Sequence, residues 1–249
     1  MTIRERVLAG ETVMGAMVFE CMVPAMPQLL ALAGAEYCVY DMEHSGASVE
    51  TIKAQAAFCR GLPVTPMARP PRGEYRYIAR LLDSGVKGIM APMIESAAEA
   101  ETLVSACRYP PTGRRGAAFG FAHDDYAPGD PKAKMAKADA EVLVIAQIET
   151  ERGLAHAEAI AATDGVDVIW IGQADLSNFL GRPGDFESAV YRDACAAIRA
   201  AAERHGKAMG VLATSPAGMA AYRAEGYGML AAGTDQAILV EGYRRILAG

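Results

Sequence analysis

Two acidic residues follow short apolar runs in the middle of the chain. Glu149 comes soon after the run at 142–146, and Asp175 comes soon after the run at 166–171. Runs of this length, rich in β-branched residues, are typical of buried parallel strands. Carboxylates that follow successive strands can converge on one cation. Because neither has a His or Cys beside it, the pair favours Mg²⁺, Mn²⁺ or a similar octahedral ion, with water and substrate as further ligands. The alternative is that each carboxylate caps the helix that follows it.

Further reactive residue types occupy equivalent places on other predicted strands. Asp41 and His44 follow one apolar run, Arg69 follows the next, and Gln147 lies two residues before Glu149. An arginine can hold a carboxylate or a developing enolate with its planar guanidinium, although an ion pair at the rim would also explain it. A histidine can move a proton. An ion, an arginine and a histidine around one pocket indicate chemistry next to the carbonyl of a 2-oxo acid.

The elements that position these residues alternate as strand and helix about eight times. No linker or shift in composition divides the chain, so residues 1–249 are predicted to form a single (β/α)8 TIM barrel domain. In such a barrel the reactive residues lie at the carboxyl ends of the strands. A doubly wound open sheet is the alternative, but no G-x-G-x-x-G motif follows the first strand. The strands are expected at 13–19, 37–40, 63–68, 86–91, 142–146, 166–171, 208–213 and 229–232.

One segment breaks this alternation. Residues 108–130 are rich in Pro, Gly, Arg and aromatic side chains and have no clear period. A long loop of this kind inside a compact domain is usually functional, for example as a lid or as a contact between subunits.

Composition excludes several classes of partner. The net charge is −6, and no stripe of Lys or Arg interleaved with aromatic residues occurs, so a nucleic-acid partner is not expected. The five cysteines form no C-x-x-C pair, which favours reduced, buried thiols in a cytoplasmic protein. The charged amino-terminal residues are not followed by a signal-peptide apolar region, and no apolar run reaches transmembrane length, so no membrane association is expected.

Six motifs, in chain order, resemble the HpcH/HpaI aldolase family. The resemblance runs from about Gly15 to the terminal helix. The motifs are Tyr40-Asp41-Met42-Glu43-His44, Ala68-Arg69-Pro70, Gly88-Ile89-Met90-Ala91-Pro92-Met93, Arg108-Tyr109-Pro110-Pro111-x-Gly113-x-Arg115-Gly116, Gln147-Ile148-Glu149-Thr150 and Gly172-x-Ala174-Asp175-Leu176-Ser177.

The resemblance implies a class II, metal-dependent pyruvate aldolase. Such an enzyme reversibly cleaves 4-hydroxy-2-oxo acids to pyruvate, or a related 2-oxo acid such as hydroxypyruvate, and an aldehyde. It implies a divalent ion (Mg²⁺, Mn²⁺ or Co²⁺) on Glu149 and Asp175. It places Arg69 on the carbonyl oxygen and the enolate, and makes His44 the acid–base residue, acting through metal-bound water.

The resemblance also assigns supporting roles. Asp41 and Asp83 would support the histidine or the arginine, with Asp83 coming from a neighbouring subunit. Gln147 and the backbone at Ala174 would position pyruvate, and Leu212 is a candidate for the aldehyde pocket. The implied assembly is a homohexamer, a trimer of dimers, with the carboxyl-terminal helix exchanged between paired subunits.

The sequence departs from the family pattern at Gln173, where proline is usual, and in residues 19–24, near the expected aldehyde pocket. Three other functions stay open. The first is decarboxylation of oxaloacetate, or another C–C cleavage of a 2-oxo acid, on the same scaffold. The second is a non-catalytic barrel that binds a small acid. The third is a phosphate-binding barrel that uses residues 213–215 and 233–234, although these residues can equally well cap helices.

Overall fold

Eight parallel strands close into a barrel in the computed structural model, which describes residues 1–248. Each strand pairs with its neighbours in chain order, and β1 pairs with β8 to complete the ring. This topology confirms the (β/α)8 prediction and excludes the open sheet. The strands are β1 (Val13–Val18), β2 (Tyr37–Asp41), β3 (Thr65–Arg69), β4 (Gly88–Ala91), β5 (Leu143–Ile148), β6 (Val168–Ile171), β7 (Ala208–Ala213) and β8 (Met229–Thr234).

The strands are buried on both faces, which is why they are apolar runs without polar alternation. One set of side chains fills the barrel interior, including Tyr37, Met67 and Trp170. The other set packs outward against the helices. Helix α1 (Ile3–Leu8) belongs to the interior cluster through Ile3 and Val7, so it covers the amino ends of the strands.

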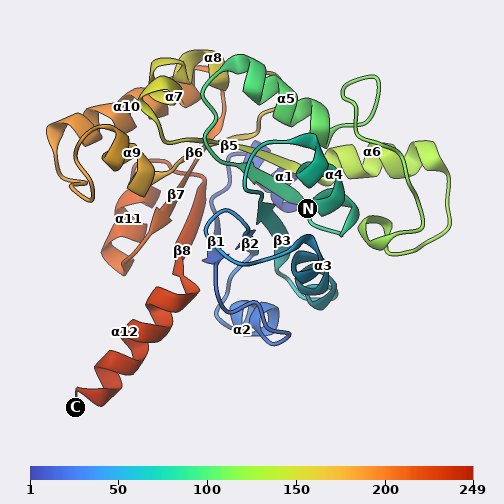
Figure 1. The fold of residues 1–249 in the computed structure, drawn as a ribbon, viewed down its shortest axis with the longest axis horizontal. Helices are drawn as coiled ribbons and strands as arrows, with labels where there is room; N and C mark the ends of the chain where they lie inside the picture. Colours follow the sequence, from blue (N-terminus) through green and yellow to red (C-terminus); the bar gives the residue numbers. More distant parts are fainter. Residues whose placement is uncertain (249) are drawn as a thin grey trace.

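The remaining helices follow the strands around the ring (Figure 1). They are α2 (Met26–Leu32), α3 (Val49–Phe58), α4 (Tyr75–Asp83), α5 (Ala97–Cys107), η1 (Ala122–Asp124), α6 (Pro131–Glu141), α7 (Glu151–Ala155), α8 (Ala157–Ala161), α9 (Gln173–Phe179), α10 (Ala189–Arg204), α11 (Pro216–Ala224) and α12 (Asp235–Leu247). None of the helices in residues 1–248 has both the length and the apolar character that a membrane crossing requires.

Two helices depart from regular geometry at their ends. The helical segment after β5 is divided into α7 and α8 at His156, whose backbone (φ −107°, ψ 13°) leaves the helical region. A capping box at Ser96, the N-cap of α5, is half formed. The Ser96 hydroxyl accepts from the Glu99 N–H, but the Glu99 carboxylate accepts from the N–H of Glu95 instead of the Ser96 N–H.

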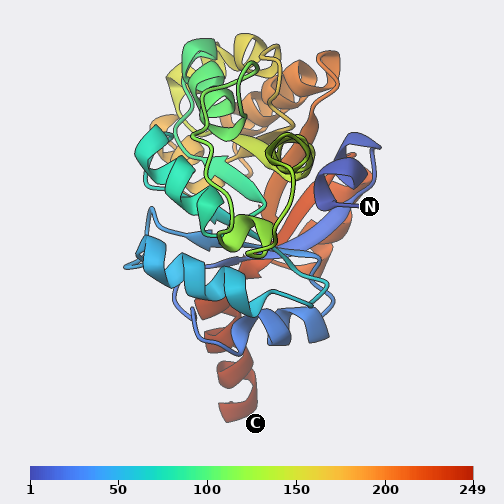
Figure 2. The ribbon, with the colours of Figure 1, turned by 90° about the vertical axis from the view of Figure 1, so that its right-hand side faces the viewer.

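Helix α12 extends away from the barrel, and the two views agree on its direction (Figures 1 and 2). Its large apolar side chains face solvent within one chain, with Ile246 77% exposed and Tyr243 61% exposed. An apolar helix surface of this kind is typical of a site of protein–protein contact. The exchange of this helix between subunits stays a prediction.

Candidate active site

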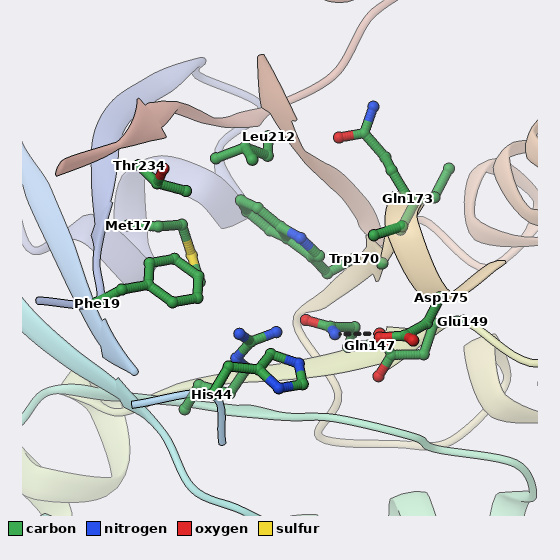
Figure 3. A pocket seen from close by; sticks show the side chains of 14 residues that line it. Met17, Phe19, His44, Gln147, Glu149, Trp170, Gln173, Asp175, Leu212 and Thr234 are labelled. Carbon is green, nitrogen blue, oxygen red and sulfur yellow. Dashed lines mark hydrogen bonds between the residues drawn. The ribbon is translucent and has the colours of Figure 1, made fainter. Parts of the chain in front are cut away.

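A pocket of about 250 Å³ opens at the carboxyl ends of the strands. It gathers predicted residues from β2, β3, β5, β6 and β7, or the loops after them, and Figure 3 shows most of their side chains converging. Its polar and apolar linings lie on different sides, with Glu149 and Asp175 opposite Met17 and Phe19. The lining residues are Met17, Phe19, His44, Arg69, Gln147, Glu149, Trp170, Ile171, Gly172, Gln173, Ala174, Asp175, Leu212 and Thr234.

Glu149 is a buried carboxylate directly after β5, only 1% exposed. One of its oxygens accepts the backbone N–H of Met93 at 2.7 Å, and the other accepts the Gln147 side-chain amide at 2.5 Å. Met93 adopts a left-handed backbone (φ 55°), an uncommon conformation that is often found at functional sites. Burial raises the pKa of Glu149 to about 7, and these hydrogen bonds only partly offset that rise. A bound cation would relieve the same cost.

Gly172 leaves the space that the Glu149 carboxylate fills. A Cβ at position 172 would lie 2.1 Å from Glu149 Oε2 and 2.7 Å from its Cβ. Both contacts are far inside van der Waals distance. The residue that directly follows β6 therefore has to be glycine if the carboxylate of the neighbouring strand is to keep this position.

Asp175 lies in the first turn of α9, half-buried and on the same side of the pocket as Glu149 (Figure 3). The capping alternative is wrong for both carboxylates. Thr150 caps α7 by accepting the Gly153 N–H at 3.0 Å, and the N-cap position of α9 is occupied by Gly172.

The donor set fits a hard divalent ion in an open site. Two carboxylates offer anionic oxygens to the pocket, and one of them, Glu149, is buried. Residues 1–248 contain no group of three His, Cys, Asp or Glu side chains that could hold an ion by themselves. Two protein carboxylates leave coordination positions for water and substrate oxygens, as in sites where Mg²⁺ or Mn²⁺ takes part in chemistry.

Arg69, at the end of β3, is 6% exposed and is fixed by two carboxylates. Its Nε lies 2.5 Å from Asp41 Oδ1, and its Nη1 lies 3.2 Å from Glu43 Oε2. The Phe19 ring lies against the guanidinium, with 5.5 Å from Cζ to the ring centroid. Arg69 therefore forms ion pairs, as in the alternative of an ion pair at the barrel rim, but its side chain is buried and lines the pocket. A guanidinium held in this way keeps one orientation.

His44 enters the pocket from the loop after β2. Its backbone N–H donates to Asp41 Oδ2 at 2.7 Å, and its Nε2 lies 3.6 Å from Glu43 Oε2. Asp41 therefore contacts the side chain of Arg69 but only the backbone of His44. The His44 ring itself is 54% exposed, so it stands where the pocket meets solvent.

Glu43 was not among the predicted site residues, although it contacts both Arg69 and His44. Burial raises the pKa of Glu43 to about 6 against the effect of Arg69, and the nearby carboxylates of Asp41 and Asp175 add to the rise. Its position between Asp41 and His44 at a strand end was the available signal. Met17, Trp170 and Thr234 were also missed, because apolar or small residues on strands are usually core residues. Phe19 belongs to the segment 19–24 that was expected near the aldehyde pocket, and it lines the pocket.

Asp83 does not join the pocket within one chain. It ends α4, and its Oδ1 lies 3.1 Å from Arg115 Nη2. It lines a separate hollow with Arg80 and Phe121, beside the long loop at 108–130. A contribution of Asp83 to the site of a neighbouring subunit stays a prediction.

Comparisons with known proteins agree with this geometry. The chain is 38% identical over 229 residues to a hydroxypyruvate/pyruvate aldolase of Roseovarius nubinhibens, covering 90% of this chain and 87% of that protein. It is 34% identical over 212 residues to a 5-keto-4-deoxy-D-glucarate aldolase of Shigella dysenteriae, covering 85% and 82%. The crystal structure of an HpcH/HpaI aldolase from Desulfitobacterium hafniense matches with a TM-score of 0.94 at 28% identity, covering 100% of this chain and 96% of that chain.

The sequence profile of the family described as HpcH/HpaI aldolase/citrate lyase matches residues 17–241. That match includes every strand from β2 to β8 and all the residues that line the pocket. The chain therefore belongs to the HpcH/HpaI aldolase/citrate lyase family and is a carbon–carbon lyase.

Proposed function

We propose that the chain is a metal-dependent class II aldolase. It would reversibly cleave 4-hydroxy-2-oxo acids to an aldehyde and pyruvate, or a related 2-oxo acid such as hydroxypyruvate. The names of relatives that are 34–38% identical support this substrate class. The observation that carries the proposal is the buried carboxylate of Glu149, held by the Met93 N–H and the Gln147 amide, beside Asp175 and in the same pocket as Arg69. The whole chain would act as one catalytic domain.

Glu149 and Asp175 are the residues that would hold the divalent ion. When bound, the ion would supply Lewis-acid polarisation of the carboxylate and keto oxygens of the substrate. Gln147 holds one Glu149 oxygen and the Met93 N–H holds the other, so the carboxylate is oriented before any ligand arrives. The choice among Mg²⁺, Mn²⁺ and Co²⁺ is open, because oxygen ligands accept all three.

In cleavage, the bond between C3 and C4 of the substrate breaks as the C4 hydroxyl loses its proton. His44 would take that proton directly or through a water molecule, since its ring stands at the mouth of the pocket. The electron pair moves toward the C2 oxygen, where the guanidinium of Arg69 would stabilise the negative charge. Protonation of C3 then gives pyruvate. Asp41 and Glu43 would keep Arg69 oriented throughout.

The two ends of the substrate would occupy different linings of the pocket. The backbone at Ala174, in the first turn of α9, would help position the 2-oxo acid. Leu212, with Met17 and Phe19, would contact the aldehyde, because these side chains lie away from the carboxylates (Figure 3). These apolar contacts would favour aldehydes with an apolar part.

Assembly and location belong to the same proposal. The exposed apolar side chains of α12 support a homo-oligomer in which this helix packs on a second copy, up to the hexamer that the family resemblance implies. The five cysteines are all free, which supports a reducing, cytoplasmic location.

The test is pyruvate release from a simple 4-hydroxy-2-oxo acid, followed through lactate dehydrogenase. Release should stop with EDTA and return with added Mg²⁺ or Mn²⁺. If no pyruvate is released with any metal, the aldolase proposal fails, and the same preparation should be assayed for decarboxylation of oxaloacetate. Release that is unchanged by EDTA would contradict the metal site while leaving the aldolase activity in place.

A further inference from the structure

Asp235, the first residue of α12, is bonded to the loop that follows β1. Its Oδ1 accepts the backbone N–H of Phe19 at 2.9 Å, and its Oδ2 accepts those of Glu20 at 3.0 Å and Cys21 at 2.5 Å. Three successive amides on one carboxylate fix the conformation of a short segment. The pKa of Asp235 is lowered: burial opposes the charge, but the hydrogen bonds from these amides outweigh it, so the carboxylate stays ionised.

The loop held in this way carries a wall of the pocket. Phe19 lines the pocket, and the guanidinium of Arg69 lies over its ring. Asp41 and Glu43 bind Arg69 through its nitrogens, whereas the guanidinium carbon of Arg69 lies over the Phe19 ring, 5.5 Å from its centroid. This is a cation–π contact. A chain of direct contacts therefore leads from Asp235, which is not in the pocket, to a residue that faces the substrate.

We propose that Asp235 is a positioning residue for the reaction, acting through residues 19–21 to hold Phe19 against Arg69. The inference rests on the proposed function, because Arg69 and Phe19 would contact the substrate there. A purely structural role for Asp235 would be the favourable placement of an acidic residue at the start of a helix. That role needs no contact with the β1 loop, and it predicts no link to Phe19.

The substitution Asp235→Asn separates the two roles. Asparagine keeps the shape of the side chain, but it has one acceptor oxygen, and its NH₂ group would face an N–H donor. At least one of the three loop amides therefore loses its acceptor. Asp193→Asn is a matched control, because Asp193 is an exposed acid on α10 with the same change of charge and size.

The first measurement is hydrogen exchange of the amides of residues 19–21, read by mass spectrometry. It depends on the folded protein and not on its reaction. In Asp235→Asn these amides should exchange at least about tenfold faster than in the parent, since an amide is protected only while its hydrogen bond holds. Unchanged exchange in a folded variant would overturn the proposal, whatever the enzyme turns out to catalyse.

The second measurement is a double-mutant cycle on pyruvate release, with Asp235→Asn, Phe19→Ala and the pair. Each single variant should lower kcat/KM by about 10- to 100-fold, the scale of a displacement of about 1 Å at a reactive group. The pair should be no more than about twofold worse than the poorer single variant, because both changes remove the same contact. Asp193→Asn should match the parent.

The outcomes are distinct. If the two losses multiply, or if Asp235→Asn lowers only the melting temperature, Asp235 does not act through Phe19 and the proposal is wrong. If the parent releases no pyruvate, the proposed function fails, and the exchange measurement alone decides whether Asp235 holds the loop.

Discussion

Replacing Gly172 with alanine should disable the metal site without a change in any charged residue. The new Cβ would be 2.1 Å from Glu149 Oε2, where real contacts are not shorter than 3.0 Å. The carboxylate must therefore move by about 1 Å, a displacement that can cost about 100-fold in rate at a reactive centre. The same movement breaks the 2.5 Å bond from Gln147. A hydrogen bond to a charged group contributes about 1.5–3 kcal/mol, or about 10- to 100-fold in an equilibrium constant.

Two assays read these effects. Calorimetric titration with Mn²⁺ should show affinity reduced by about 10- to 100-fold, and pyruvate release should fall by about 100-fold. Overpacking costs about 1–3 kcal/mol, which lowers the melting temperature by about 2–12 °C for a chain of this size. The variant should thus stay folded at 25 °C, so that loss of activity is not loss of structure.

Gly228→Ala is the control for this experiment. A Cβ at position 228 would meet the Cβ of Ala208 at 3.5 Å, an ordinary contact far from the pocket. It should leave Mn²⁺ affinity and turnover unchanged. If Gly172→Ala binds Mn²⁺ and releases pyruvate within about threefold of the parent, then Glu149 is not held as described or does not bind the ion.

Three further predictions concern the pH dependence of metal binding, the role of Arg69 and the α12 surface. Burial raises the pKa of Glu149 from 4.5 to about 7, so between these pH values the folded metal-free protein keeps a proton on Glu149 that the unfolded chain has released. The free energy of unfolding therefore falls as the pH rises from about 4.5 to 7. Mn²⁺ affinity should therefore rise about tenfold per pH unit up to about pH 7 and then level off; calorimetry at several pH values would contradict this with a flat profile. Arg69→Ala should keep the fold but lower kcat by about 100-fold or more, as for loss of one preorganised oxyanion partner, and turnover within a few-fold of the parent would make Arg69 a structural ion pair only. Ile246→Asp should lower the assembly mass measured by light scattering, because this exposed side chain would lie in the proposed α12 contact; an unchanged mass would remove Ile246 from it.

Most of the pocket's polar residues could be predicted from the sequence, because reactive residues of a (β/α)8 barrel lie at the carboxyl ends of its strands. Parallel strands bring their carboxyl ends to one rim, so Glu149, Asp175, Arg69 and His44 could be expected together before any coordinates existed. The fold could also be predicted, because continuous apolar runs that alternate with helical patterns are compatible with only a few architectures.

Two features of the site could not be predicted from the sequence, because they depend on contacts between segments that are far apart in the chain. Position 172 must be glycine because of the Glu149 side chain, which follows the neighbouring strand β5. The hydrogen bonds from the β1 loop to Asp235 join residues 214 to 216 positions apart in sequence. Neither contact can be predicted from the local pattern of residues around these positions. The predicted role of Asp83 depends on a second chain. Within one chain Asp83 contacts Arg115 and lies outside the pocket, so it could reach only the pocket of a neighbouring subunit.

Closure of the barrel between β1 and β8 has a consequence for synthesis of the protein. A ribosome makes β1 before β8, so both edges of the growing sheet stay unpaired until β8 is available. The strands that precede Glu149 and Asp175, β5 and β6, are neighbours and can pair before β8 is made, whereas Phe19 gains its hydrogen bond only after Asp235 has been added. The nascent chain can therefore bring its two carboxylates together before Phe19 is fixed on the opposite wall of the pocket, and it carries unpaired strand edges until β8 has been made.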